Sequence, residues 1–222
     1  MGADAKNATV QTIDDLIARV KTYLPAADGP LVRKAYDFAA KAHDGHKRLS
    51  GDPYITHPLA VAAHLADLEQ DDKTISAALL HDTIEDTPFE LKDIEKEFGA
   101  EIARLVSGVT KIGQLVFESQ EQRQAENFRN MLLAMGEDIR VIIIKLADRL
   151  HNMQTLQHLP PDRQIYIAQE TREIFAPLAH RLGMWRLKWQ LEDLAFRYLE
   201  PKQFENMKQQ ITLRRGDRET YV

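Results

Sequence analysis

The segment that decides the fold, Thr74–Asp86, has the sequence TISAALLHDTIED. Its first half is apolar nearly all round, which is typical of a helix buried at the centre of a helical domain. Its second half places an imidazole and a carboxylate side by side, at His81 and Asp82, at the end of that helix. Burying two such groups is costly unless a partner satisfies both. The segment therefore predicts a helical core with a buried cation site at its edge.

Helical spacing of apolar residues continues on both sides of this segment. Thr12 and Asp15 form a capping-box pattern at the first helix, and Thr87 is expected to cap a helix that Gly99 ends. Pro177 predicts a kink or break. No stretch predicts a strand, so we expect an all-α fold with about ten helices and no substantial sheet. Besides the central helix, the expected helices lie near residues 13–20, 31–43, 58–69, 88–99, 100–112, 121–135, 137–153, 162–183, 185–199 and 202–212.

Composition and charge exclude several classes of protein. The chain has no Cys, which excludes a disulfide scaffold, a Cys-rich zinc site and a thiol nucleophile. With 29 basic and 34 acidic residues, general affinity for nucleic acid or for an anionic membrane is not expected. The longest apolar runs, such as Val141–Ile144, are far short of a membrane span, and the N-terminus lacks a secretory signal. We therefore expect a cytoplasmic protein whose metal ligands are His, Asp or Glu.

Two further residues complete a candidate ligand set. His57 stands directly before Pro58, where a loop delivers its side chain to a helix end, and Asp148 interrupts a second apolar helix. With His81 and Asp82 they offer two imidazoles and two carboxylates, a set that suits Mn, Fe, Co or Zn. Taken singly, a His-Asp pair is typical of a cap or a surface, and Asp148 of a salt bridge with a neighbouring base. The ordered conjunction of all four resembles the HD superfamily of metal-dependent phosphohydrolases.

Two acidic residues follow the candidate ligands. On a helix, Glu85 and Asp86 lie four positions after His81 and Asp82, so they continue the same face. One interpretation is that they orient and deprotonate a water next to the metal. The other is a solvated helix end, although acids at a helix C-terminus oppose the helix dipole.

Neutral and basic groups lie near the candidate ligands in the sequence. Asn152 and Thr155 stand four and seven positions after Asp148, where they could hold a ribose hydroxyl or a phosphate, or form a polar stripe that faces water. The loop Lys41–Gly51 is locally basic, and its Arg48 could stack on a base, form paired hydrogen bonds with a phosphate, or be solvated.

A closer resemblance rests on four blocks of sequence. In these blocks, and from about residue 31 to 204, the chain resembles the N-terminal hydrolase domain of the Rel/SpoT family of (p)ppGpp synthetases and hydrolases. The resemblance implies an HD-type helical domain with one Mn²⁺ that hydrolyses the 3′-pyrophosphate of ppGpp or pppGpp to GDP or GTP and pyrophosphate. The four blocks are His46–Pro58, Leu80–Thr87, Lys145–Met153 and Ala176–Gly183.

The resemblance also implies a role for each candidate residue. The metal would be held by His57, His81, Asp82 and Asp148. Glu85 and Asp86 match the pair that activates water. The guanosine nucleotide would be held by Arg48, Ser50, Asn152 and Thr155.

One residue departs from the family pattern. Leu49 stands where many relatives have a second basic residue, which weakens the expected contacts to the base on that side. The resemblance further implies a hydrolase domain over residues 1–200 and a C-terminal helix and linker over 201–222, leading towards synthetase and regulatory domains.

Two other functions fit the same motifs. The chain could be an HD phosphohydrolase of another nucleotide, or a non-catalytic nucleotide-sensing module. Loss of the His-Asp or Glu-Asp residues would favour the sensor. All six are present, so we favour the hydrolase.

Overall fold

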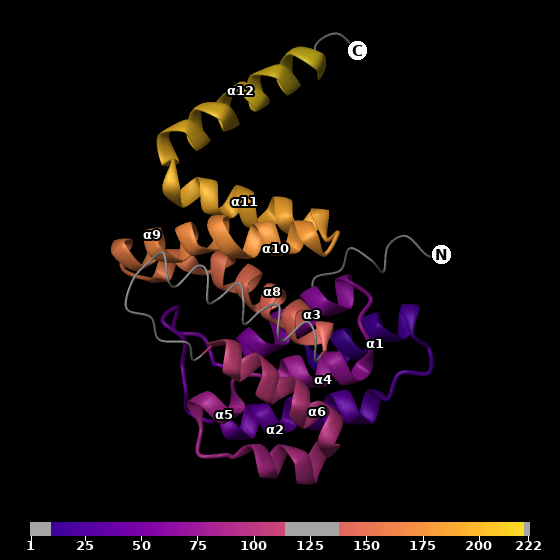
Figure 1. Cartoon of the computed structure of the whole chain (residues 1–222). Coiled ribbons are helices and arrows are strands. Elements are labelled where there is room, and N and C mark those ends of the chain that lie inside the picture. The colour runs from indigo at the N-terminus through magenta and orange to yellow at the C-terminus, as the bar shows by residue number, and fades with distance from the viewer. Residues whose placement is uncertain (1–9, 114–137, 220–222) are drawn as a thin grey trace. The chain divides into compact units, whose positions relative to one another are not determined.

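The computed structural model of the 222-residue chain describes the backbone of residues 10–113 and 138–219 (Figure 1). Within these residues the only β-type pairing is an isolated antiparallel bridge between Lys47 and Pro53. The expected all-α fold class is thus confirmed. The expected helix at 121–135 lies outside the described residues.

The chain divides into two compact units, Met1–His151 and Asn152–Val222. The first unit contains α1 (Ile13–Tyr23), α2 (Gly29–Ala42), α3 (Thr56–Asp67), α4 (Asp72–Leu80), α5 (Thr83–Asp86), α6 (Leu91–Gly113) and most of α8 (Ile139–Gln154). The second contains the 3₁₀ turn η2 (Leu156–His158), α9 (Pro161–Glu170), the π-helical turn η3 (Thr171–Phe175), α10 (Ala176–Arg181), α11 (Trp185–Leu199) and α12 (Pro201–Glu219). The division at residue 200, which rests on the family resemblance, stays a prediction.

Helix α4 is the centre of the first unit. Residues 74–80 are all buried, and α4 packs against α2, α3 and α6 (Figure 1). The carboxylate of Asp71 accepts a hydrogen bond from the Thr74 backbone N–H at 2.7 Å, so the helix starts slightly earlier than its apolar run. It ends at Leu80, and a turn at His81 and Asp82 leads into α5. This arrangement places the His-Asp pair at the edge of the core, as its sequence predicts.

Local sequence sets several of the helix ends. The capping box of Thr12 and Asp15 is present, with hydrogen bonds of 3.2 and 2.9 Å. The predicted helix start at Thr87 is wrong, because the Thr87 hydroxyl donates to the Thr83 carbonyl and the next helix begins at Leu91. Gly99 interrupts α6 with a φ of 83°, which favours glycine, and this agrees with the expected helix end.

In the second unit the α-helical hydrogen-bond pattern changes just before Pro177, where a kink or break is expected, while the backbone stays helical. Pro177 has no N–H and cannot donate to the carbonyl four residues earlier. The chain forms a π-helical turn, Thr171–Phe175, directly before it. α12 extends to Glu219, beyond the predicted end at residue 212.

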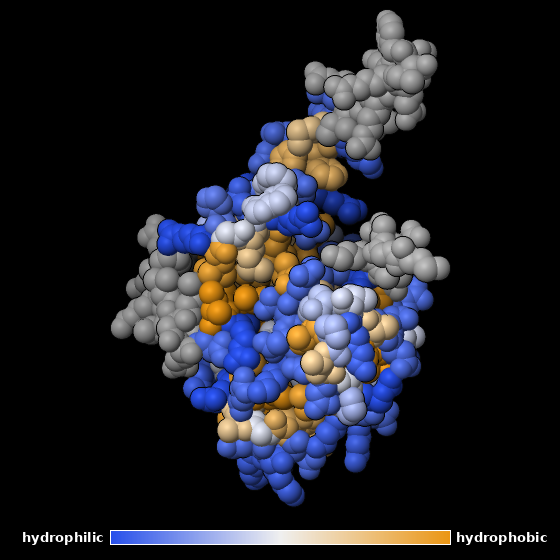
Figure 2. All heavy atoms as spheres, turned by 90° about the vertical axis from the view of Figure 1, so that its right-hand side faces the viewer, coloured by the Kyte–Doolittle hydropathy of each residue, from blue (hydrophilic) through white to orange (hydrophobic). Residues whose placement is uncertain are grey.

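The molecular surface carries both polar and apolar regions. On the face in Figure 2, hydrophilic residues surround smaller patches of hydrophobic ones. Large exposed apolar side chains include Leu49 in the first unit, and Trp185 and Trp189 in the second. In the described part of the chain, no helix has the length and apolarity to cross a membrane.

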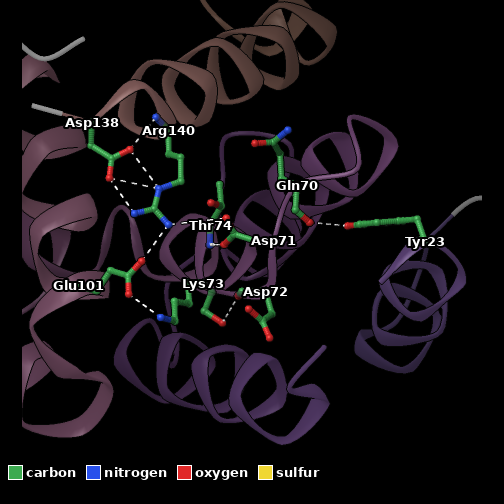
Figure 3. A network of polar contacts seen from close by, with 10 residues as sticks. Tyr23, Gln70, Asp71, Asp72, Lys73, Thr74, Glu101, Asp138 and Arg140 are labelled. Atoms are coloured by element: carbon green, nitrogen blue, oxygen red, sulfur yellow. Dashed lines mark hydrogen bonds and ion pairs between the residues drawn. The ribbon is translucent and has the colours of Figure 1, made fainter. Parts of the chain in front are cut away.

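A polar network joins three helices of the first unit (Figure 3). The Arg140 guanidinium, at the start of α8, donates to Asp138 through Nε at 3.0 Å and to Glu101 of α6 through Nη1 at 3.0 Å. Nη1 also lies 3.6 Å from Oδ2 of Asp71, the residue that caps α4. Lys73 pairs with the other oxygen of Glu101. The network therefore links the starts of α4 and α8, two helices that lead to His81 and Asp148.

We predict that Arg140→Gln lowers the free energy of unfolding by about 1 kcal/mol at pH 7, and by less at about pH 3. The hydrogen bonds from Arg140 hold the pKa of Asp138 below its usual value. A carboxylate with a lowered pKa stabilises the fold above its unfolded-state pKa, and this stabilisation is lost as the pH falls through its folded-state pKa. Urea denaturation at both pH values measures the difference.

The matched control is Arg33→Gln, which removes an exposed ion pair with Asp14. It should change the free energy of unfolding by less than about 0.5 kcal/mol at either pH. A loss for Arg140→Gln that is as large at low pH as at pH 7 would show that the network does not stabilise the fold through its charges.

Candidate metal centre

Four side chains from separate elements meet in the first unit. His57 lies in the first turn of α3, His81 follows α4, Asp82 precedes α5, and Asp148 lies on α8. One ligand atom each from His57, His81 and Asp148 all lie within 4.8 Å of one another, and these three residues are buried. Such a group could hold a metal ion.

The Nε2 atoms of both imidazoles face carboxylate oxygens. His57 Nε2 lies 3.3 Å from Asp148 Oδ1 and 3.5 Å from Asp82 Oδ2. His81 Nε2 lies 3.0 Å from Asp82 Oδ1 and 3.9 Å from Asp148 Oδ1. The structure thus brings all four predicted ligands together.

The Nδ1 atoms of both imidazoles have other partners. His81 Nδ1 lies 2.8 Å from the Ala78 carbonyl oxygen, which can only accept, so Nδ1 carries the hydrogen. His57 Nδ1 lies 2.7 Å from His151 Nδ1. Burial lowers the pKa of His151 to about 3, so this ring is neutral and can accept from His57. Both candidate ligands are then tautomers whose Nε2 lone pair points at the carboxylates.

This arrangement fits a cation. His81 Nε2 is buried and has no aligned hydrogen bond among the described residues, although Asp82 Oδ1 is close. A lone pair facing two carboxylates is repulsive unless positive charge lies between them. Burial opposes charge on His81, yet Asp82 and Asp148 outweigh it and raise the pKa of His81 to about 9. The site therefore demands positive charge, and a divalent ion bound by both Nε2 atoms would supply it.

The carboxylates are held in their charged form. Burial disfavours the charge of Asp148, but Lys145 and then His57 hold the pKa of Asp148 well below its usual range. Lys145 Nζ lies 3.0 Å from Asp148 Oδ2, so one oxygen of Asp148 faces the base and the other faces the imidazoles. The salt bridge and the candidate ligand role, which the sequence offers as alternatives for Asp148, thus occur together.

Glu85 and Asp86 lie beside the cluster on α5, and both are exposed. Partial burial raises the pKa of Glu85, against the opposing charge of Lys145. The Asp86 backbone N–H donates to the Asp82 carbonyl oxygen at 3.0 Å, so the helical spacing predicted for this pair holds across the turn. The Tyr54 hydroxyl lies 2.7 Å from Asp86 Oδ2.

The predicted nucleotide-binding residues fall in both units. Arg48 is near enough for its charge to help lower the pKa of His151, after burial and His57. The Ser50 hydroxyl donates to Asp52 Oδ2 at 2.7 Å, and Leu49 is 72% exposed. Asn152 and Thr155 belong to the second unit, so their contribution to this site stays a prediction.

Sequence reasoning missed two residues in this region. Tyr54 contacts both Asp82 and Asp86, and His43 is buried against the Tyr54 ring. The contact of His151 with His57, 94 positions away, is not expected from the sequence either. Tyr54 and His151 lie within two of the blocks that carry the family resemblance, His46–Pro58 and Lys145–Met153, which is the signal that could have found them.

Comparison with known proteins places this geometry in a family. The model of the HD domain family matches residues 35–185. The chain belongs to the HD domain family. The chain is 54% identical over 190 residues to the probable guanosine-3′,5′-bis(diphosphate) 3′-pyrophosphohydrolase of Synechocystis sp., covering 86% of this chain and 25% of that protein. It is 50% identical over 203 residues to the bifunctional (p)ppGpp synthase/hydrolase SpoT of Escherichia coli, covering 91% and 29%.

A solved structure agrees with the HD assignment. It is described as a metazoan ortholog of SpoT that hydrolyses ppGpp. The TM-score is 0.56 at 25% identity, over 75% of this chain and 94% of that one. The resemblance of this HD domain to the Rel/SpoT family is thereby confirmed. The chain spans only 25% and 29% of the two curated relatives.

We predict that Asp82→Ala weakens binding of Mn²⁺ by about 100-fold or more, because loss of an outer-shell partner alone costs about 10–100-fold and this change removes a ligand. Isothermal titration of the chelator-treated chain measures the affinity. Asp37→Ala, at an exposed carboxylate of α2, is the matched control and should bind like wild type. Equal affinity of Asp82→Ala and wild type would remove Asp82 from the ligand set.

Proposed function

We propose that this HD domain is a metal-dependent hydrolase that removes the 3′-pyrophosphate of ppGpp and pppGpp, releasing GDP or GTP and pyrophosphate, with Mn²⁺ as its cofactor. The named activities of the relatives support the substrate. The observation that carries the reaction class is the pair of buried Nε2 atoms facing two carboxylates, 3.0 to 3.9 Å away, with Glu85 and Asp86 alongside.

His57, His81, Asp82 and Asp148 would hold the ion. When bound, the ion supplies a Lewis acid that offsets negative charge on the phosphate and acidifies nearby water. The protein contributes orientation: Ala78 and His151 fix the tautomers of the imidazoles, and Lys145 fixes one oxygen of Asp148.

Glu85 is the proposed general base. Its exposure lets it reach water, while partial burial raises its pKa and makes its carboxylate a stronger base than an ordinary Glu. Asp86 would orient the same water. A base needs its deprotonated form, so the rate should fall with acidification at a pH above the usual pKa of Glu.

Arg48, Ser50, Asn152 and Thr155 are the proposed contacts to the guanosine nucleotide. The guanidinium of Arg48 can bring positive charge towards a highly anionic substrate, which supports this role. With Leu49 beside it, this HD domain would depend on Arg48 for contact with the base on that side.

Incubation of the purified chain with ppGpp and Mn²⁺, followed by a chelator, tests the function. We expect release of GDP and pyrophosphate that stops when the chelator is added. Binding of ppGpp without release would contradict the proposal and favour a nucleotide sensor. Release from other nucleotides but not from ppGpp would favour a hydrolase of different specificity.

We predict that Glu85→Gln slows the chemical step by about 10²–10⁴-fold, because the amide cannot accept the proton, while the affinity for Mn²⁺ stays near that of wild type. Single-turnover kinetics and metal titration measure the two effects separately. Glu95→Gln, at an exposed position of α6, is the control and should leave both unchanged. Loss of metal in Glu85→Gln would mean that Glu85 is a ligand and not the base.

A further inference from the structure

We propose that Tyr54 is a positioning residue of this centre, whose hydroxyl ties the candidate ligand Asp82 to Asp86. The role given to Asp86 rests on the proposed function, whereas the contacts of the Tyr54 hydroxyl are observed in the structure. Tyr54 lies two residues before α3, in the loop that leads into the helical turn of His57. The start of α3 thus brings a candidate ligand close to the residue that organises its neighbours.

The hydroxyl contacts both carboxylates. Its oxygen lies 2.8 Å from Asp82 Oδ2 and 2.7 Å from Asp86 Oδ2. A phenol has a single hydrogen to donate, so the two carboxylates share one donor. Like charges four positions apart on a helical turn repel each other. A donor placed between them offsets that repulsion and holds one oxygen of each side chain.

The contact orients Asp82 towards the imidazoles. With Oδ2 held by the hydroxyl, Oδ1 is the oxygen that lies 3.0 Å from His81 Nε2. Without the hydroxyl, the Asp82 carboxylate would lose the hydrogen bond that fixes its rotation. Affinity for the metal should then fall, because an inner ligand that is not held in place binds less tightly.

The contact also restrains Asp86. This side chain is exposed, and an exposed carboxylate samples several rotamers in water. The hydroxyl holds Oδ2 and leaves Oδ1 for water or substrate. Small displacements of an orienting group reduce rate strongly, so the loss of this restraint should lower kcat.

The Tyr54 ring is itself fixed. The His43 ring stacks on it with centroids 4.3 Å apart and planes 15° apart. His43 is buried, and neither of its ring nitrogens has a hydrogen-bond partner among the described residues, so it contributes through this stacking. On the other side, the Tyr54 backbone accepts from the His57 N–H at 3.0 Å. Burial, and then the charge of Asp82, raise the pKa of Tyr54, so its hydroxyl remains a donor.

Tyr54→Phe tests the proposal, since it keeps the ring and its stacking and removes only the hydroxyl. Titration of the chelator-treated chain with Mn²⁺ should show an affinity about fivefold or more weaker than wild type, as expected for loss of a hydrogen bond to a charged group. At saturating Mn²⁺, kcat for ppGpp should be about tenfold lower with KM within about twofold. The melting temperature should stay close to that of the control.

The matched control is Tyr23→Phe. The Tyr23 hydroxyl also donates a partly buried hydrogen bond, of 2.7 Å, to the Gln70 carbonyl oxygen (Figure 3). This variant loses the same atom elsewhere in the same unit, and its metal affinity and kcat should equal those of wild type.

A second variant separates the contact of Tyr54 with Asp86 from its contact with Asp82. Asp86→Asn should lower kcat without weakening metal binding, and adding Tyr54→Phe to it should lower kcat no further, because both changes break the same link. If Tyr54→Phe lowers kcat as much in the Asp86→Asn background as in the wild-type chain, the proposed link between Tyr54 and Asp86 is overturned.

Wild-type metal affinity and kcat in Tyr54→Phe would overturn the proposal. A loss of kcat that disappears at saturating Mn²⁺ would overturn the part of it that concerns Asp86. If the wild-type chain hydrolyses no ppGpp, the proposed function fails, but the titration still decides the Tyr54 contact. Weaker metal binding by Tyr54→Phe then supports the link to Asp82, and equal binding refutes it.

Discussion

The structure depends on one electrostatic constraint: two buried imidazoles direct their Nε2 atoms at two carboxylates. His81 and His57 cannot turn away, because their Nδ1 atoms are held by the Ala78 carbonyl and by His151. Asp148 cannot turn away either, since Lys145 holds its second oxygen. A cation is the group that makes all of these contacts favourable together.

The helical fold supplies the geometry that this constraint requires. Helix α4 is buried along residues 74–80, so the turn that follows it delivers His81 at the edge of the core. The cap of α4 at Asp71 and the start of α8 at Arg140 share one polar network. The elements that carry His81 and Asp148 are therefore fixed at their beginnings by charge and along their lengths by apolar packing. The acidic residues Glu85 and Asp86 are exposed to solvent at the edge of this core.

Much of this arrangement could be predicted from sequence, since it follows from local pattern. The apolar run before His81 predicts the central helix, Thr12 and Asp15 predict a cap, and Pro177 predicts a break. The start at Leu91 could not be predicted, because the Thr87 hydroxyl completes α5 and Phe89 packs on the Phe38 ring, with centroids 4.8 Å apart. The contacts of Tyr54 with Asp82 and of His57 with His151 join residues 28 and 94 positions apart. Helical periodicity predicts contacts only between residues a few positions apart. The residues that orient the ligands were therefore harder to predict from sequence than the ligands themselves.

The most direct measurement of the central claim is an anomalous difference map from a crystal of the chain grown with Mn²⁺. The constraint predicts one peak in the first unit, within coordination distance of His57 Nε2, His81 Nε2 and oxygens of Asp82 and Asp148. No peak at this position, or a peak bonded to other side chains while the imidazoles keep their lone pairs on the carboxylates, would contradict it.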